Sequence, residues 1–512
     1  MAVVNLRARS ARSEPLLTAR TLALWAGPAV WAGLAVFLAA YNLERYPSVW
    51  FDEGMTLHVP KALVQLGVYA DVSSEGFRYF GPSGTVGPTV LLPIALAFRL
   101  FGIGLVPARL VMVAYLLIGL ALFALAARRQ YCTTTAAIGS ALLIATPGIN
   151  LIWLGRQVLG ETPALVFLLA GFLFWRDAVR PGQAGRGRLL AASVAFGLAA
   201  LTKSQVGLVL GMALAVFWLV DRLYYRRLRL LDTGLPFVAV GTGVALGVLV
   251  QLAPSLGSAD IGPILTQWRE VSGGAIFVFS PGRTLSSLKF LTSADALTYW
   301  GLAGVCYGIA LARRRTLAGV QQGFLVVFAA VGLAWFAFAS IGWPRYAFAP
   351  LVVATIFAAK LLRDLVFVSL ERNAALGAAI SLALTLVIGQ SLVAELREVA
   401  TADDQSPQLM AAYLEANVPT STVVETWEEE LGFLTDHRYH YPSGGWLNRA
   451  VRVQWLGTRD DLGSYEPFPE ARPSYLVVGR FAKYTGIYRS LLTHTDGRPI
   501  VSIGEYDLYR LS

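Results

Sequence analysis

Long runs of apolar residues alternate with short polar stretches from Leu22 to about Glu395. A helix needs about 20 apolar residues to cross a bilayer, and about 11 segments approach that length. The pattern therefore predicts an all-α polytopic membrane bundle. We place the spans near residues 22–42, 106–126, 134–153, 162–176, 188–202, 205–220, 233–252, 297–312, 319–341, 346–362 and 374–393.

The stretch between the first two spans, about 43–105, is predicted to be a large external loop containing interfacial helices. Pro88 to Phe101 is apolar but too short for a span, and Gly and Pro residues flank it. Met55 to Gly67 mixes apolar and polar positions. We expect both segments to lie along the membrane surface. A second external loop, about 253–296, is expected to be a lid or a lipid-facing segment.

The hydrophobicity stops near Glu395, which divides the chain into a membrane domain, 1–395, and a soluble α/β domain, 396–512. Within the second domain the pattern predicts a helix over 407–417 and strands at 423–426, 475–479 and 504–511. Its aromatic cluster, Tyr439-His440-Tyr441 with Trp446, could stack on sugars, but we prefer the interpretation of a small core.

Composition agrees with a membrane protein, because 56% of the residues are hydrophobic and only 14% are charged. Soluble domains are nearer a quarter charged. The two cysteines, Cys132 and Cys306, lie in or beside different apolar segments, so we expect no disulfide or zinc site. The N-terminal segment is basic and its apolar run is followed by many others. It is therefore predicted to be a retained anchor.

The net charge of +10 is concentrated in short arginine clusters that follow even-numbered spans. Loops rich in Lys and Arg stay on the cytoplasmic side. The charge therefore predicts membrane orientation, and not a nucleic-acid partner. We expect a multi-pass protein of the plasma (inner) membrane with a cytoplasmic N-terminus and an extracytoplasmic C-terminal domain. The clusters are at 128–129, 176–188, 222–229, 313–315 and 360–372.

Charged side chains gather at the predicted external ends of the spans, where they are costly unless they have a partner or a function. Asp52 and Glu53 follow the first span, and each short external turn carries further polar groups. If the spans form one bundle, these groups are expected to meet in one external pocket. The groups in the turns are Arg156, Glu161, Lys203, Arg345 and Tyr346.

Acids and fixed cations together suit phosphate chemistry. Arg and Lys bind phosphate, and a carboxylate accepts a proton or holds a divalent metal. With a bilayer beside the pocket, the simplest substrate is a lipid-linked phosphate. A divalent cation is left open, with Asp52 and Glu161 as its candidate ligands. Further residues that could contact a substrate are His58, Arg78 and Tyr79.

Each of these residues also has a structural interpretation. Lys203 could cap a helix C-terminus, and Glu161 could pair with a helix dipole. Arg345 could be an interfacial anchor beside Trp343, and His58 an ordinary loop histidine. The functional interpretation depends on the groups meeting on one side.

The order of these motifs resembles the GT-C superfamily of integral membrane glycosyltransferases, in particular its protein O-mannosyltransferase and aminoarabinose transferase branch. The resemblance covers about 1–365. It rests on a Phe-Asp-Glu-Gly start to the long external loop, Ala108-Arg109-Leu110, a Gly155-Arg156 turn followed by an acid, a Leu-Thr-Lys turn at 201–203 and Pro344-Arg345-Tyr346.

The resemblance implies transfer of a sugar from a polyprenyl-phosphate donor to an acceptor hydroxyl on the outer face, by an inverting mechanism. The acceptor would be a lipid, a glycan or a protein. Asp52 would be the catalytic carboxylate, with Glu53 beside it. The donor phosphate would be bound by Lys203, Arg345 and Tyr346, with Arg156 in addition, and Glu161 would be the second acid.

One element departs from the resemblance. Aminoarabinose transferases often have a Lys-Pro-Pro-Leu element at the start of the interfacial helix, whereas this chain has Val86-Gly87-Pro88-Thr89.

Two other classes of function stay open. A transporter or flippase of a lipid-linked sugar would show broken helices and polar groups near the bilayer midplane. A non-catalytic lipid-binding scaffold would tolerate neutralisation of Asp52, Glu53 and Glu161.

Overall fold

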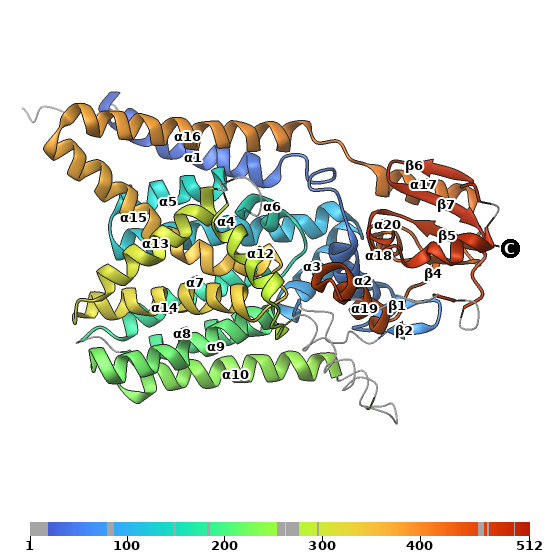
Figure 1. Ribbon diagram of the computed structural model, residues 1–512, viewed down its shortest axis with the longest axis horizontal. Coiled ribbons are helices and arrows are strands. Elements are labelled where there is room, and N and C mark those ends of the chain that lie inside the picture. Colours follow the sequence, from blue (N-terminus) through green and yellow to red (C-terminus); the bar gives the residue numbers. More distant parts are fainter. Residues whose placement is uncertain are drawn as a thin grey trace, which may run out of the picture.

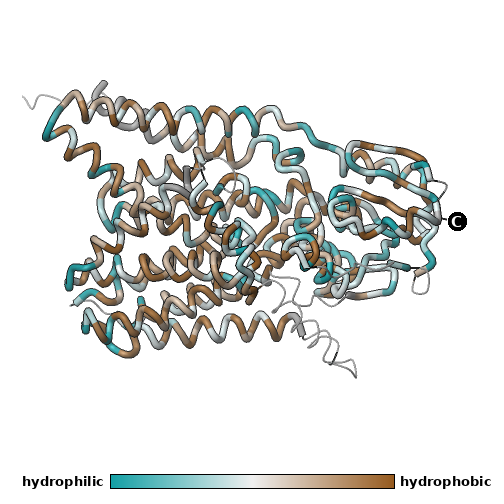
Figure 2. The backbone as a smooth tube through the Cα atoms, in the orientation of Figure 1, coloured by the Kyte–Doolittle hydropathy of each residue, from teal (hydrophilic) through white to brown (hydrophobic). Residues whose placement is uncertain are grey.

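The structure is a computed structural model. It describes residues 19–78, 86–146, 150–181, 185–252, 262, 276–293, 296–458, 465–467, 471–495 and 497–511. Figure 1 shows a long bundle of helices with the C-terminal domain at one end of its longest axis. In Figure 2 apolar residues dominate the bundle, whereas polar residues gather at its far end and in the C-terminal domain.

Each predicted span except 134–153 falls mainly on one helix. The helices of the bundle are α1 (Ala19–Ala40), α4 (Leu105–Gln130), α5 (Thr133–Ala145), α6 (Leu151–Arg156), α7 (Glu161–Ala178), α8 (Gly185–Thr202), α9 (Ser204–Val220), α10 (Leu230–Leu252), α13 (Ala296–Ala312), α14 (Leu317–Phe338), α15 (Phe348–Arg372) and α16 (Ala374–Thr401). The short π-helix η1 (Asp221–Tyr225) continues α9, η4 (Pro344–Ala347) is a 3-10 turn, and α12 (Pro281–Leu291) precedes α13.

Five helices in the described residues are long and apolar enough to cross a membrane, and several others are shorter apolar helices. The predicted span 134–153 is corrected, because α5 ends at Ala145 and α6 begins only at Leu151. The sequence between them contains Pro147-Gly148, a pair that disfavours helix. Asn150 then caps α6 by accepting a hydrogen bond from the Trp153 backbone N–H at 2.7 Å.

The bundle is held together by large aromatic side chains in its interior. The ring of Phe324 on α14 lies 4.9 Å from that of Trp175, 5.4 Å from that of Phe217 and 6.1 Å from that of Phe172. All four side chains are buried. Aromatic contacts of this kind add to the stabilisation from burial, so α7, α9 and α14 form one packed unit.

The basic clusters meet at the end of the bundle opposite the C-terminal domain. Arg129 pairs with Asp177 at 3.0 Å, Arg176 donates to the Arg129 carbonyl, and Arg227 donates to the Arg315 carbonyl at 3.0 Å. The clusters that follow α4, α7, α9 and α13 therefore share one face, as the charge pattern predicts.

The long segment between α1 and α4, predicted to be an external loop, contains helices at both predicted positions, α2 (Phe51–Leu66) and α3 (Pro88–Phe101). Helix α3 has the predicted bounds, with Pro88 in its first turn and Gly102 as its C-cap. A hairpin of β1 (Asp71–Ser73) and β2 (Gly76–Arg78), which the sequence did not predict, lies between the two helices.

The C-terminal domain is built on a five-stranded sheet of order β4-β3-β5-β7-β6. Strand β3 runs parallel to β4 and β5, and β7 is antiparallel to β5 and β6. The predicted helix and three predicted strands are present. The elements are α17 (Ser406–Asn417), β3 (Val423–Thr426), α18 (Glu429–Leu434), β4 (Arg438–His440), α19 (Gly444–Leu456), β5 (Tyr475–Val478), α20 (Arg480–Thr485), η5 (Ile487–Arg489), η6 (Leu491–His494), β6 (Val501–Ile503) and β7 (Tyr506–Arg510).

Candidate active site

A cavity of about 350 Å³ lies where the bundle meets the C-terminal domain. Both parts of the chain contribute to its wall. Its described lining consists of Trp50, Phe51, Asp52, Met55, Thr56, Val86, Trp153, Leu159, Lys203, Gln205, Ile276, Trp343, Pro344, Arg345, Tyr346, Leu447, Asn448, Val451, Trp455 and Phe481. Three of the predicted external turns therefore converge on one cavity, as expected.

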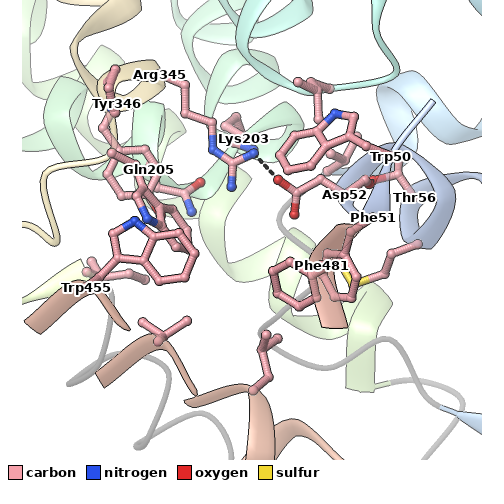
Figure 3. A pocket seen from close by; sticks show the side chains of 18 of the residues that line it. Trp50, Phe51, Asp52, Thr56, Lys203, Gln205, Arg345, Tyr346, Trp455 and Phe481 are labelled. Atoms are coloured by element: carbon pink, nitrogen blue, oxygen red, sulfur yellow. Dashed lines mark hydrogen bonds and ion pairs between the residues drawn. The ribbon is translucent and has the colours of Figure 1, made fainter. Parts of the chain in front are cut away.

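Asp52 lies in the first turn of α2, where the helix dipole favours a carboxylate. The helix starts there because Trp50 is extended, with φ −148° and ψ 175°. The indole of Trp50 donates to the Gln157 side chain at 2.6 Å, which fixes the entry to the helix. Figure 3 shows the Arg345 side chain reaching Asp52, with which it forms an ion pair.

The charges of the cavity continue beyond this pair into a small cluster. Lys203 Nζ lies 3.1 Å from Glu161 Oε1, and Arg345 Nε lies 3.9 Å from the same oxygen. Two carboxylates thus alternate with two cationic side chains, and all four side chains are at least four-fifths buried. We call Asp52, Glu161, Lys203 and Arg345 the charge cluster.

Burial and charge act against each other on the two cations. Burial lowers the pKa of Lys203 below its usual range, although Glu161 opposes the shift. Burial also acts to lower the pKa of Arg345, but Asp52 and Glu161 outweigh it and raise that pKa above its usual range. A phosphate entering the cluster would add negative charge beside two cations that are already held in place.

The loop before α3 positions the turn that carries Lys203. The Gly87 backbone N–H donates to the Thr202 carbonyl at 2.9 Å, and Val86 forms a β-bridge with Lys203. A Cβ on Gly87 would lie 1.7 Å from the Leu201 carbonyl oxygen, so this contact requires glycine. These backbone contacts hold the turn that carries Lys203 against the start of α3.

The structure corrects the predicted positions of Glu53 and Arg156, because the described cavity lining does not include them. Glu53 is fully buried and pairs with Arg109 through both oxygens, at 2.9 and 2.5 Å. Arg156 donates to the backbone carbonyls of Leu38, Tyr41 and Tyr46. Arg156 therefore fastens the end of the first span to α6, whereas Glu53 fastens α2 to α4.

His58 lies on the far side of α2, in contact with the C-terminal domain. Its Nδ1 is 2.5 Å from Asp71 Oδ1, and its Nε2 is 2.7 Å from the Glu429 carbonyl oxygen. A carbonyl only accepts, so Nε2 carries a hydrogen. The Arg78 side chain and Tyr79 lie outside the described residues.

Two groups of residues are candidate metal ligands, and neither fits well among the described residues. His58, Asp71 and Glu429 lie close enough to hold an ion, but both imidazole nitrogens already make hydrogen bonds. The guanidinium of Arg345 lies between Asp52 and Glu161 and contacts both carboxylates, in the position that a shared metal ion would take.

The C-terminal domain is fastened to α2 beside Asp52. A Cβ on Gly54 would lie 2.2 Å from the backbone nitrogen of Glu430, so the two helices touch through their backbones. Lys61 donates to three carbonyls at the end of α18, at 2.6 to 3.1 Å. The rings of Phe51 and Phe481 are stacked, with centroids 4.3 Å apart.

The sequence did not predict the aromatic and C-terminal parts of the cavity wall, which include Trp50, Trp343, Trp455 and Phe481. The tryptophans beside Phe51-Asp52 and Pro344-Arg345 were the available signal. The contributions of α19 and α20 had no local signal. The core interpretation of Tyr439 and Tyr441 is confirmed, because both are buried inside the C-terminal domain.

Comparisons with known proteins agree with this architecture. The family model described as dolichyl-phosphate-mannose-protein mannosyltransferase matches residues 85–253, which include Glu161 and Lys203. ArnT from Cupriavidus metallidurans, solved with undecaprenyl phosphate bound, superposes with a TM-score of 0.65 over 96% of this chain and 98% of its own, at 15% identity.

These matches agree with the resemblance of the chain to the GT-C superfamily of integral membrane glycosyltransferases. A second GT-C structure is the oligosaccharyltransferase AglB from Archaeoglobus fulgidus, in complex with an inhibitory peptide and a dolichol-phosphate. It has a TM-score of 0.61 and 12% identity, over 92% of this chain and 71% of its own. At these identities the structures establish the GT-C fold alone. No curated protein sequence matches this chain significantly.

Proposed function

We propose that this GT-C protein transfers a sugar from a polyprenyl-phosphate donor to an acceptor hydroxyl on the outer face of the membrane, with inversion at the anomeric carbon. The charge cluster is the observation that carries the proposal: Asp52, Lys203 and Arg345 line the cavity, and Glu161 pairs with Lys203 behind its wall. The outer face is supported by the arginine clusters at the opposite end of the bundle.

Lys203 and Arg345 are the proposed ligands of the donor phosphate. They lie on neighbouring turns of the cavity wall, so both can reach the same phosphate oxygens. Arg presents a fork of N–H donors and Lys a point charge, which suits a phosphate ester. The ArnT structure with undecaprenyl phosphate and the AglB structure with a dolichol-phosphate support a lipid phosphate as the carrier.

Donor binding would also prepare Asp52 for catalysis. Without a ligand, the carboxylate is held by Arg345. A phosphate that bonds to Arg345 competes for the guanidinium and releases Asp52 toward the cavity. Asp52 then accepts the proton of the acceptor hydroxyl while the acceptor oxygen bonds to the anomeric carbon. The bond from that carbon to the phosphate oxygen breaks, and its electron pair leaves with the polyprenyl phosphate, which the two cations stabilise.

Glu161 acts through Lys203 in this scheme. Its carboxylate opposes the effect of burial on the pKa of Lys203 and lies 3.1 Å from the amine, which it holds beside the cavity. Glu161 is therefore a proposed positioning residue.

The experiment that tests the proposal compares Asp52→Asn with Asp403→Asn in the purified full chain. Asp403 is exposed and forms a surface ion pair with Arg45, which contributes little to stability. Transfer from a polyprenyl-phosphate sugar should fall about 10²- to 10⁴-fold in Asp52→Asn, whereas Asp403→Asn should match the wild type. Near-normal turnover in Asp52→Asn would show that Asp52 is not the catalytic carboxylate. A product with the anomeric configuration of the donor would contradict inversion.

Binding of polyprenyl phosphate separates the roles further. Asp52→Asn frees Arg345 from its partner, so this variant should bind the lipid phosphate at least as tightly as the wild type. Lys203→Ala should bind it about 10-fold or more weakly, because a charge-assisted hydrogen bond is lost. Equal affinities of Lys203→Ala and wild type for polyprenyl phosphate would show that the role of Lys203 is structural.

A further inference from the structure

The side of the cavity away from the membrane bundle is built by two helices of the C-terminal domain. Helix α19 contributes Leu447, Asn448, Val451 and Trp455, and α20 contributes Phe481. The spacing of the α19 residues places them on one helical face. The ring of Trp455 meets that of Trp343 edge to face, with centroids 5.7 Å apart. The wall is therefore joined to the turn that carries Arg345.

This wall is chemically different from the rest of the cavity. Its described residues carry no charge, whereas the charged lining residues Asp52, Lys203 and Arg345 all come from the first 395 residues. The arginines of α19 are directed elsewhere: Arg449 and Arg452 are exposed, and the Arg449 guanidinium lies over the Trp446 ring at 4.9 Å.

Two hydrogen-bond donors, one on α19 and one on the turn that contacts it, are buried and lack a partner in the described part of the chain. They are Asn448 Nδ2 and Trp343 Nε1, and both residues line the cavity. A buried donor without a partner costs free energy, so a ligand that supplies acceptors would gain by pairing with them. Beside them, Phe51 and Phe481 present stacked rings, which suit the C–H faces of a sugar.

We propose that α19 and α20 form the acceptor subsite, and that this subsite takes a neutral, hydroxyl-bearing sugar ring. The inference rests on the proposed function, because inversion requires the acceptor to approach from the side opposite the phosphate held by Lys203 and Arg345. Sugar hydroxyls accept from Asn448 and Trp343, and the ring lies against the aromatic side chains. A phosphorylated acceptor would meet an uncharged wall and lose its hydration without compensation.

The test uses the purified full chain with a polyprenyl-phosphate sugar donor and a panel of acceptors. Neutral octyl glycosides are compared with the matching 6-phosphates, and methyl glycosides distinguish a free sugar from a lipid-borne one. The wild type should prefer neutral glycosides. Asn448→Leu should raise the acceptor KM about 10-fold, as expected for one lost hydrogen bond, with polyprenyl-phosphate affinity within twofold of wild type. Arg449→Gln, on the exposed face of α19, is the matched control.

A variant that acquires a new acceptor preference tests the subsite without relying on a loss of activity. Asn448→Lys introduces a cation into the wall and should shift the preference toward the 6-phosphates. A wild-type preference for phosphorylated acceptors, or an unchanged acceptor KM in Asn448→Leu, would overturn the subsite. Polyprenyl-phosphate binding without transfer to any acceptor would count against the proposed transferase activity itself.

Discussion

Replacement of Gly54 by Ala probes the contact between α2 and the C-terminal domain. The new Cβ would lie 2.2 Å from the Glu430 nitrogen and 2.4 Å from its Cα. These are backbone atoms, so no side-chain rotation relieves the clash. The helices must separate by about 1.2 Å to reach ordinary contact at 3.4 Å. Overpacking of this kind costs about 1–3 kcal/mol of unfolding free energy.

The effect on catalysis should exceed the effect on stability. Asp52 lies two residues before Gly54 in the same helical turn, and a displacement of about 1 Å at a reacting group costs about 10²-fold in rate. We therefore expect kcat for sugar transfer to fall by that order, while polyprenyl-phosphate affinity stays near wild type because Lys203 and Arg345 lie on other elements.

The assay measures kcat at a temperature where thermal unfolding shows the variant to be folded. Gly33→Ala is the control, since a Cβ at Gly33 meets no atom within 4 Å. A kcat within twofold of wild type in Gly54→Ala would refute the idea that the C-terminal domain sets the position of Asp52.

Three further predictions concern buried ionisable side chains. Glu53→Gln leaves Arg109 without its partner and should lower the unfolding free energy by about 3–5 kcal/mol, measured by thermal unfolding in detergent. Lys61→Met removes the cation from the end of α18 and should raise hydrogen exchange in that helix, by about 10-fold or more. Burial, and then Glu428, raise the pKa of Glu430 well above its usual range. The folded state thus keeps a proton that the unfolded chain releases above about pH 4.3, so stability should fall as the pH rises toward the folded pKa. Glu430→Gln should flatten that fall, and an unfolding midpoint with the wild-type pH dependence would contradict the assignment.

Local sequence patterns were sufficient to predict the helices and strands whose residues carry strong sequence signals. Helix α3 lies between Pro88 and Gly102 as predicted, because proline suits a helix start and glycine suits its end. Strand β3 was found because its short run is rich in β-branched residues, as is typical of strands. By contrast, α19 has mixed composition, and its cavity-facing side is defined only by contacts with a distant turn.

The error over Glu53 has a simple geometric cause. Asp52 and Glu53 were predicted to be neighbours in a loop, but both lie in the first turn of α2. Successive residues of an α-helix point about 100° apart, so one carboxylate faces the cavity while the other faces Arg109. The external turns, in contrast, were placed together correctly because charge and topology constrain them independently of side-chain direction.

The backbone contact at Gly54 bears on how such proteins can be recombined. The Ser74 backbone N–H also donates to the Tyr439 carbonyl at 2.6 Å, which extends the contact to the β1–β2 hairpin. Residues 50–78 and the C-terminal domain therefore form one structural unit, although more than 300 residues separate them in the chain. A chimera that exchanges the C-terminal domain alone should misalign Asp52. One that exchanges it together with residues 50–78 should keep transferase activity and acquire the acceptor preference of its donor parent.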